Sequence, residues 1–418
     1  MLMKKKIIYI SILLLIISSF SFAQGGSIYS RYGIGDIIHS YSARRMGFGN
    51  LGSAVIDKDY VDGYNPASWS SLYFTRFSLS AKMLAANYSD NSIDVTHTKI
   101  IFSGFTFGFP IQRDYGISAA LGLIPISNLR YNIKKIIQSP ILGDFSENFE
   151  GKGSLSKVFL GFSFRVPTQT SLGATFEYYT GTNNYYSSQD FSDNPDFRDI
   201  SYQTTYKYHG VGTTLSLITG NVLDLFSNNN NSQLRFSFLT NLVSELGTDT
   251  SIIAKTSIGE IEKLNGETTT ILPNRYTLGA SFAWNKKYLL MFDYLYQPFS
   301  KYQFNGKYDN HLKDLVKLSV GFEYKDKSYG IHATNFERMS LRLGVSYEET
   351  QYTFNGININ QYSVHAGIAF PFSDVNYIDF SLAAGVRGTT DANLIQEKFI
   401  SATFTLTLAE LWFVRPDR

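Results

Sequence analysis

The sequence predicts an all-β protein: a transmembrane antiparallel β-barrel of about fourteen strands, with an N-terminal hatch segment plugging its lumen. Three observations predict this fold. The chain opens with an export sequence, its later segments alternate apolar and polar residues, and none of them could cross a bilayer as an apolar helix. Aromatic residues make up 16% of the chain and charged residues only 17%, below the usual quarter or so. An exported, aromatic-rich and alternating chain is typical of outer-membrane barrels.

The first 23 residues have the composition of a secretory signal peptide. Lys4–Lys6 precede an apolar run, Ile7–Phe20, and a small-residue cleavage site ends at Ala23. The apolar run is shorter than the roughly 20 residues that a spanning helix needs. Without residues 1–23, basic and acidic side chains nearly balance, so no nucleic-acid partner is predicted. The chain has no cysteine, which excludes disulfides and cysteine-ligated metals.

Period-two alternation identifies the strands. In residues 315–324, for example, Leu318 and Val320 share one face while Lys317 and Glu323 share the other. A charged side chain cannot face lipid at low cost, so the polar face is predicted to line the lumen. Strands are predicted at 76–83, 99–109, 115–124, 156–166, 171–179, 200–217, 233–240, 275–284, 288–296, 315–324, 340–347, 362–370, 376–387 and 398–408. A misassigned hairpin would change the number to twelve or sixteen.

The connections between these strands predict the orientation of the barrel. Pro110–Asp114, Pro167–Thr170 and Asn285–Lys287 are short, whereas 126–155, 181–199 and 241–274 are long. Short periplasmic turns and long outer loops are typical of outer-membrane barrels. The barrel is predicted to span residues 76–413, followed by a polar tail at 414–418. A soluble sandwich would divide so long a chain into domains joined by linkers, and no linker is apparent.

Residues 24–75 follow no strand period and are predicted to form the hatch. The interior of a barrel of about fourteen strands is wider than its own side chains can fill, so a plug is expected. Inside the lumen such a segment meets no lipid, and an irregular backbone is therefore tolerated. Glycines allow close packing against the wall, and a proline fixes its own φ and restricts the residue before it. The hatch residues singled out are Gly47, Gly49, Gly52, Asn65, Pro66 and Ala67.

The stretch "ARRMGFGNLGSAVIDKDYVDGYNPASWSSL", residues 43–72, resembles the hatch of the FadL-type long-chain fatty acid and aromatic hydrocarbon transporters. The likeness lies in its glycines, its acidic patch and the Asn-Pro-Ala before the first strand. "SRYGIGD", Ser30–Asp36, resembles Bacteroidetes-type members. The chain departs from the family at Ser68 and Trp69 and in its polar C-terminal tail. The resemblance implies a Gram-negative outer-membrane channel for passive, hatch-gated uptake of hydrophobic small molecules such as long-chain fatty acids, without a cofactor.

Aromatic residues on and beside the second long loop are candidates for binding such a ligand: Tyr179, Tyr185, Tyr186, Phe191 and Phe197. The expected partners are this ligand, outer-membrane lipid and lipopolysaccharide, the barrel-assembly machinery, and other envelope proteins. The alternative function is a FadL-like barrel that serves as a protein-binding platform or secretion-system component. A dry, aromatic lumen would favour transport, and a polar, filled lumen would favour the platform.

Catalytic motifs do not support an enzyme. "GFGNLG" at Gly47–Gly52 matches the dinucleotide pattern G-x-G-x-x-G, but no strand precedes it and no acidic residue follows at the required spacing. The six histidines show no metal-ligand spacing, and there is no G-x-S-x-G motif. No catalytic residue, metal or cofactor is predicted.

Overall fold

The computed structural model describes residues 26–410, apart from 91–93, 140–142, 192–198, 227–230, 257–258, 327–336 and 374. The predicted signal peptide, the polar tail at 414–418 and Phe197 lie outside the described residues. None of the helices in the described part is long and apolar enough to cross a membrane.

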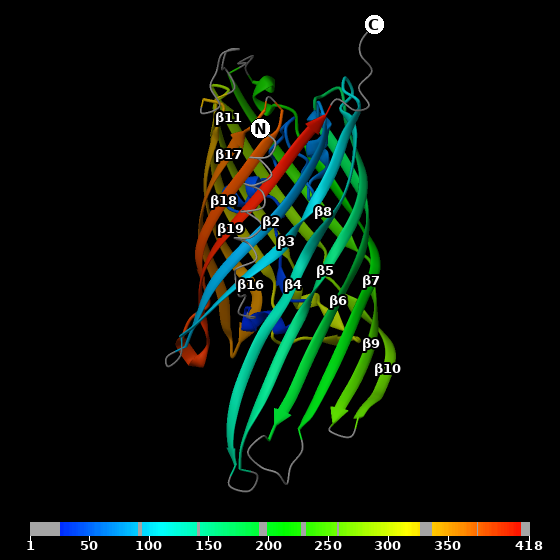
Figure 1. The fold of residues 1–418 in the computed structure, drawn as a ribbon. Coiled ribbons are helices and arrows are strands. Elements are labelled where there is room, and N and C mark those ends of the chain that lie inside the picture. The colour runs from blue at the N-terminus through cyan, green and yellow to red at the C-terminus, as the bar shows by residue number, and fades with distance from the viewer. Residues whose placement is uncertain are drawn as a thin grey trace, which may run out of the picture.

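The wall of the molecule is one closed antiparallel sheet (Figure 1). Strands β8 and β9 lie end to end along β7, and β11 and β10 pair with them in turn, so the wall has fourteen strands, as predicted. β19 pairs with β2 along its whole length, which closes the barrel and leaves no free edge. The wall consists of β2 (Thr75–Ser89), β3 (Asp94–Gln112), β4 (Ile117–Ser139), β5 (Gly143–Arg165), β6 (Ser171–Asp190), β7 (Ile200–Ile218), β8 (Ser232–Val243), β9 (Leu246–Thr256), β10 (Gly259–Ile271), β11 (Arg275–Trp284), β12 (Tyr288–Gln297), β15 (Leu315–Lys325), β16 (Ser340–Phe354), β17 (Ile357–Pro371), β18 (Tyr377–Arg387) and β19 (Gln396–Glu410).

The two faces of the wall differ as the alternation predicts. Phe162 and Phe176, on the outward face, are 55% and 64% exposed. Lys157, Glu177 and Glu323, on the inward face, are at most 2% exposed. The apolar face therefore meets lipid, and the polar face lines the lumen.

The prediction of three long outer loops was wrong. Residues 126–155 lie mostly in β4 and β5, 181–190 extend β6, and 241–274 contain β9 and β10. These halves of the strands carry polar residues on both faces, as in "GDFSENFEGKGS" at 143–154, so they show no period-two pattern. Strand halves that are polar on both faces belong in water, beyond the bilayer. The ends of the hairpins β4–β5, β6–β7 and β9–β10 form what we call the tall rim, at the bottom of Figure 1.

The opposite end of the barrel, the short-turn rim, lies at the top of Figure 1 with the end of β19. Its turns at 113–116, 166–170, 285–287 and 372–376 are short. The connection from β7 to β8 is longer and contains the 3₁₀ helix η3 (Val222–Leu225). On the tall-rim side of the barrel, η4 (Phe299–Lys301) and the short strands β13 (Gln303–Phe304) and β14 (Lys307–Tyr308) join β12 to β15, while η5 (Asp391–Asn393) joins β18 to β19. These connections end before the tips of the tall hairpins.

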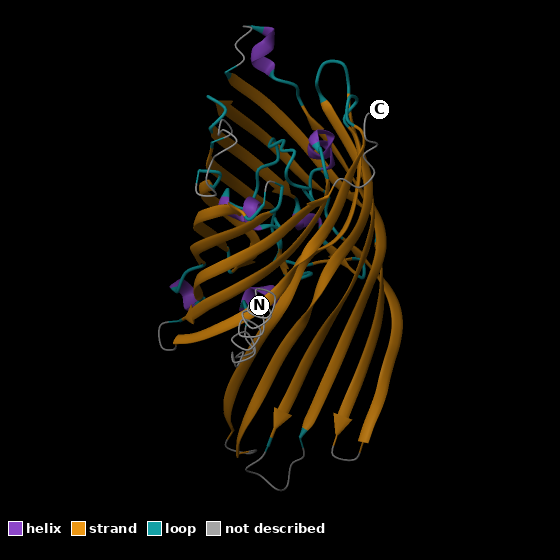
Figure 2. Ribbon diagram, turned by 45° about the horizontal axis from the view of Figure 1, so that its top comes forward, coloured by secondary structure: helices purple, strands orange, loops and turns teal. Residues whose placement is uncertain are grey.

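Residues 26–74 lie inside the barrel. Figure 2 shows loops and helices enclosed by the ring of strands. This hatch contains η1 (Ile28–Arg31), β1 (Asp36–Ile37), α2 (Ala43–Gly47) and η2 (Pro66–Ser71). β1 pairs with β4, α2 lies against β16–β19, and η2 lies against β4–β7. The segment therefore contacts strands on opposite sides of the lumen.

Candidate functional site

Asn65 fixes the hatch just before the chain enters the wall. Its side chain is fully buried; its Oδ1 accepts from the Ala67 N–H at 3.0 Å, and its Nδ2 donates to the Ser53 carbonyl at 2.5 Å. Asn65 is thereby the N-cap of η2, with Pro66 at the first helical position, where no N–H is needed. The same Ala67 N–H also donates to Ser216 Oγ of β7 at 2.8 Å. These contacts tie two parts of the hatch to each other and to the wall.

Trp69, noted as a departure from the FadL pattern, is a buried anchor of η2. Its side chain is fully buried and stacks on Phe159 of β5, with 6.0 Å between ring centroids. Its Nε1–H donates to the Asp62 carbonyl at 2.7 Å, so burial leaves the indole donor satisfied. The aromatic residue that breaks the family pattern thus fastens the hatch to the wall.

The hatch glycines lie where the backbone approaches the wall. Gly49 has φ +87°, and a Cβ there would lie 2.8 Å from the Val345 carbonyl oxygen of β16. Across that contact, a Cβ on Gly344 would lie 2.4 Å from the Gly49 nitrogen. Gly47 lies against Gly367 and Arg342, and Gly52 lies beside Met291. The backbone-to-backbone contact at Gly49 requires glycine on both sides.

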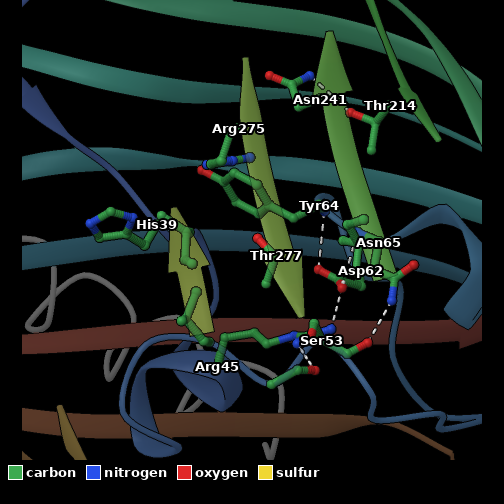
Figure 3. A pocket seen from close by; sticks show the side chains of 14 residues that line it. His39, Arg45, Ser53, Asp62, Tyr64, Asn65, Thr214, Asn241, Arg275 and Thr277 are labelled. Atoms are coloured by element: carbon green, nitrogen blue, oxygen red, sulfur yellow. Dashed lines mark hydrogen bonds and ion pairs between the residues drawn. The ribbon is translucent and has the colours of Figure 1, made fainter. Parts of the chain in front are cut away.

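A small cavity of about 40 Å³ lies between the hatch and strands β7, β8, β11 and β12 (Figure 3). Arg45 bridges its hatch side by donating to the Gly52 carbonyl and to the Asp62 carboxylate. Opposite, Arg275 of β11 lies over the Tyr64 ring, 4.9 Å from its centroid. Burial raises the pKa of the Tyr64 phenol, which therefore stays neutral. The cavity has room for little more than water.

An ion-pair cluster joins the hatch to the wall beside α2. Arg342 of β16 binds Glu323 through Nε at 2.8 Å and Asp379 through Nη1 at 2.5 Å. Its Nη2 donates to the hydroxyl of hatch residue Tyr60 at 3.2 Å, and Tyr60 in turn donates to Asp379 at 3.1 Å. Burial raises the pKa of Tyr60 well above its usual range, so the phenol remains a donor.

The acidic patch of the hatch completes this cluster. Asp57 pairs with Arg44 of α2 at 2.8 Å, and Asp59 pairs with Arg76 at 2.7 Å and Lys325 at 3.0 Å. All these side chains are buried. The hatch–wall cluster, as we call it, contains four cations and four carboxylates: Arg44, Arg76, Lys325, Arg342, Asp57, Asp59, Glu323 and Asp379. Removing one member of a neutral, fully paired set of this kind is strongly unfavourable, because it leaves a partner buried without an opposite charge.

Two further contacts hold the hatch near its start. His39 Nε2 lies 3.1 Å from Glu348 Oε1, and Lys317 binds the other oxygen of Glu348 at 2.8 Å. Burial lowers the pKa of His39, against the opposing effect of the Glu348 carboxylate. Arg387 of β18 binds Asp36 of β1 at 3.0 Å.

Toward the tall rim, the lumen contains an apolar cluster. Tyr29 and Ile34 of the hatch pack with Phe299, Tyr302 and other residues of the wall and of the connection from β12 to β15. The Tyr29 hydroxyl donates to the Ile395 carbonyl at 2.5 Å, and burial raises its pKa to about 12. The lumen is therefore aromatic on this side and ionic beside α2.

A larger space than the one beside Arg45 is a cavity of about 130 Å³ beside β1. Its lining is mixed: Lys82, Lys99 and Arg387 are cationic, whereas Leu84 and Phe399 are apolar. Pockets that hold small-molecule ligands usually have volumes of about 300–1,000 Å³. In the described part of the chain, no group of three or more His, Asp and Glu side chains could hold a metal ion.

Three of the aromatic residues proposed to bind a ligand do not lie in a loop, since Tyr179, Tyr185 and Tyr186 belong to β6, and Phe191 directly follows that strand. Tyr179 is 1% exposed and donates to Glu177 at 2.6 Å. Tyr185 packs between Tyr131 and Tyr206. Tyr186 lies under Lys152, and Phe191 stacks on Phe145. These four side chains do not converge on one pocket, so ligand binding by them remains a prediction.

The residues of the hatch–wall cluster were not identified from the sequence as a site. Glu323 was assigned to the lumen face, and Asp57 and Asp59 were noted only as an acidic patch. The sequence indicated such a cluster only by placing charged residues on the inward face of strands and opposite charges in the hatch. The pairing itself depends on which strands face the hatch, and only the closed barrel fixes that.

Solved structures show the fold that this chain shares. The monoaromatic hydrocarbon channel CymD matches with a TM-score of 0.60 at 15% identity, over 90% of this chain and 99% of that one. The toluene transporter TbuX of Ralstonia pickettii matches with a TM-score of 0.56 at 14% identity, over 89% of this chain and 99% of that one. A FadL homologue of Pseudomonas aeruginosa matches with a TM-score of 0.57 at 11% identity, over 90% of this chain and 98% of that one. At these identities the likeness establishes the outer-membrane barrel fold.

Comparison by sequence leads to a family. No curated protein matches the chain. The sequence model of one family, BamG, matches residues 3–417. That match includes the hatch, the whole wall and nearly all of the remaining chain. The chain belongs to the BamG family.

Proposed function

We propose that this barrel is a protein-binding subunit of an outer-membrane complex, and that the complex is the barrel-assembly machinery indicated by the family name BamG. In this arrangement the tall rim lies outside the cell. Its hairpins are polar on both faces and project farthest from the part of the wall whose outward face is apolar. The short-turn rim faces the periplasm, where a folding machinery would meet it.

The observation that carries this proposal is the set of ion pairs that anchors the hatch to the wall inside the lumen. Eight buried charges of the hatch–wall cluster pair with one another, and removing one partner of a buried pair costs about 3–5 kcal/mol. Moving the hatch aside would break several such pairs without offering replacements. A hatch held in this way favours a barrel that acts through its surface over one that opens for each molecule transported.

Affinity purification tests the proposal. A tag placed at Asn194, between β6 and β7, would leave the short-turn rim free. After gentle detergent extraction of native outer membranes, we expect barrel-assembly components to co-purify in a fixed ratio. A second abundant barrel carrying the same tag is the control. Recovery of the chain alone, under conditions that keep the machinery itself intact, would contradict the proposal.

A second candidate is a channel for passive uptake of hydrophobic small molecules, such as long-chain fatty acids. The cavity beside β1 favours it, because cationic Lys82 and Lys99 lie next to apolar Leu84 and Phe399. The shared fold with hydrocarbon channels is consistent with it. Uptake of a labelled fatty acid by cells that express the chain, compared with cells carrying an empty vector, tests this candidate.

A further inference from the structure

A second charged region, which adjoins the hatch–wall cluster, opens at the short-turn rim. It is a pocket of about 300 Å³ between the hatch, β8 and the β11–β12 hairpin. Its lining includes Arg235, Lys286 and Lys287 beside Val55 and Leu289. The carboxylates in the lining, Asp57 and Glu323, are already paired within the hatch–wall cluster. The pocket therefore has a surplus of positive charge.

The surplus resides in two side chains. Lys287 pairs with Asp326 at 2.8 Å. Arg235, on the inward side of β8, and Lys286, exposed in the turn, have no carboxylate within 4.0 Å among the residues that the structure describes. Asp224 of η3 attracts Arg235 electrostatically without forming an ion pair with it, and its Oδ1 accepts from Asn221 Nδ2 at 2.5 Å.

An exposed apolar projection lies on the connection that leads into β8, one of the strands that line this pocket. Leu225, at the end of η3, is 80% exposed, and Phe226, directly after it, is 84% exposed. The helix lies at the end of the barrel that carries the short turns, in green at the top of Figure 1. Large apolar side chains this exposed on a water-facing turn are typical of interaction sites.

The projection is held in a defined position. Asn221 Oδ1 accepts from the N–H groups of Leu223 at 3.3 Å and Leu234 at 2.9 Å, which caps η3 and ties it to β8. The Asn285 N–H donates to the Asn231 carbonyl at 2.9 Å, which joins the η3 connection to the turn that carries Lys286. The apolar and cationic parts thus lie on adjoining, hydrogen-bonded turns.

We propose that Leu225, Phe226, Arg235 and Lys286 form a docking surface for an acidic peptide segment of a partner protein that also carries apolar side chains. The carboxylates of that segment would pair with Arg235 and Lys286, and its apolar side chains would cover Leu225 and Phe226. This inference rests on the proposed platform function and names the part of the barrel that meets the partner.

Peptide binding to the purified full-length barrel tests this surface. The probes are two fluorescein-labelled synthetic peptides, one alternating Asp with Phe and Leu, the other with Asn in place of each Asp. We expect the acidic peptide to bind, and the double variant Arg235→Glu, Lys286→Glu to raise its Kd at least about tenfold. Lys301→Glu, an exposed lysine change at the tall rim, is the matched control and should leave the Kd unchanged.

A second variant tests the apolar part. Leu225→Ser with Phe226→Ser should also weaken binding of the acidic peptide while leaving the heat-modifiable gel shift of the barrel unchanged. Equal affinities for the two peptides, or no effect of the charge reversals, would overturn the inference. So would an apolar variant that impairs membrane insertion but not peptide binding, because Phe226 would then be a membrane anchor. If barrel-assembly components still co-purify in that case, the platform function stands and the docking surface lies elsewhere.

Discussion

Arg342 connects two groups of the wall with one group of the hatch. It binds two wall carboxylates and the hydroxyl of Tyr60, and it is 1% exposed. Its charge is matched by Glu323 on the adjacent strand β15 and by Asp379 on β18, two strands away on the other side. Paired buried charges specify position more than they add stability, since each loses its hydration on burial.

Replacing Arg342 with leucine is predicted to destabilise the folded barrel by about 3–5 kcal/mol, because Glu323 and Asp379 would remain buried with less positive charge beside them. Heat-modifiable gel mobility should show unfolding at a lower temperature, and limited proteolysis should cut the hatch sooner. Lys255→Leu, which removes an exposed pair with Glu260, is the control and should change neither measurement. An unchanged unfolding temperature for the Arg342 variant would show that the cluster does not hold the hatch.

Asn65 offers a second test at this scale. Asn65→Leu removes the N-cap of η2 and the bond to the Ser53 carbonyl, a loss of about 1–2 kcal/mol in the hatch. Pro66→Gly should loosen the same turn by less, because only backbone restriction is lost. Both variants should keep the gel shift of the folded barrel, since neither residue belongs to a wall strand. Faster proteolysis at the hatch is the expected result, and parental proteolysis rates in both would contradict it.

The hatch as an element differs from the strands in what makes it fold. Its helices are short, and η2 and α2 depend on single capping residues and on contacts with opposite sides of the wall. A segment of this kind cannot hold its shape outside the barrel. The wall, by contrast, is complete without it, because every strand pairs with its neighbours.

Deleting residues 25–68 is therefore predicted to leave an assembled barrel with an open lumen. Planar-bilayer recordings should show stepwise conductance for the deleted form and little or none for the full chain. The deletion exposes the wall charges of the cluster, such as Arg76 and Asp379, to water, where each can be hydrated. Equal conductance in the two forms would show that the hatch is not a plug, and failure to assemble would make it a folding element.

Strands were predictable from the sequence where one face meets lipid and the other meets the lumen. Leu318, Val320 and Glu323 of β15 show this contrast, so the bilayer-crossing part of each strand and the number fourteen could be predicted. The outer halves of β5 and β6 could not, since residues such as Asn148 and Asn183 alternate with other polar residues. The absence of a wall strand from residues 26–74 was predictable from their lack of period. The partners of Asp57 and Asp59 were not, because they come from β2, β15 and α2.

On the scale of the whole molecule, the two rims have different surroundings. A protease-cleavable tag at Asn194 should be cut on intact cells, whereas one inserted at Asn285–Lys287 should be cut only after the outer membrane is opened. The first site lies between the tall strands β6 and β7, and the second is the short turn between β11 and β12. Cleavage of both tags on intact cells would contradict the orientation on which the periplasmic docking surface depends.

The chain has no cysteine, so a disulfide can be introduced without competing thiols. Ser53 Oγ of the hatch lies 2.8 Å from Ser237 Oγ of β8, and the pair Ser53→Cys, Ser237→Cys should lock the middle of the hatch to the wall. The matched control is the pair Ser70→Cys, Ser171→Cys, because the two hydroxyl oxygens of these serines lie 2.6 Å apart. This second disulfide would form at the place where the hatch already joins the wall.

The most direct test of the account compares the Ser53–Ser237 variant before and after reduction by dithiothreitol. A platform needs no hatch movement, so recovery of barrel-assembly components should be the same in the locked and reduced forms, and neither form should take up labelled fatty acid. The Ser70–Ser171 variant should behave in the same way. Fatty acid uptake that the Ser53–Ser237 disulfide abolishes and reduction restores would contradict the account and establish a hatch-gated channel.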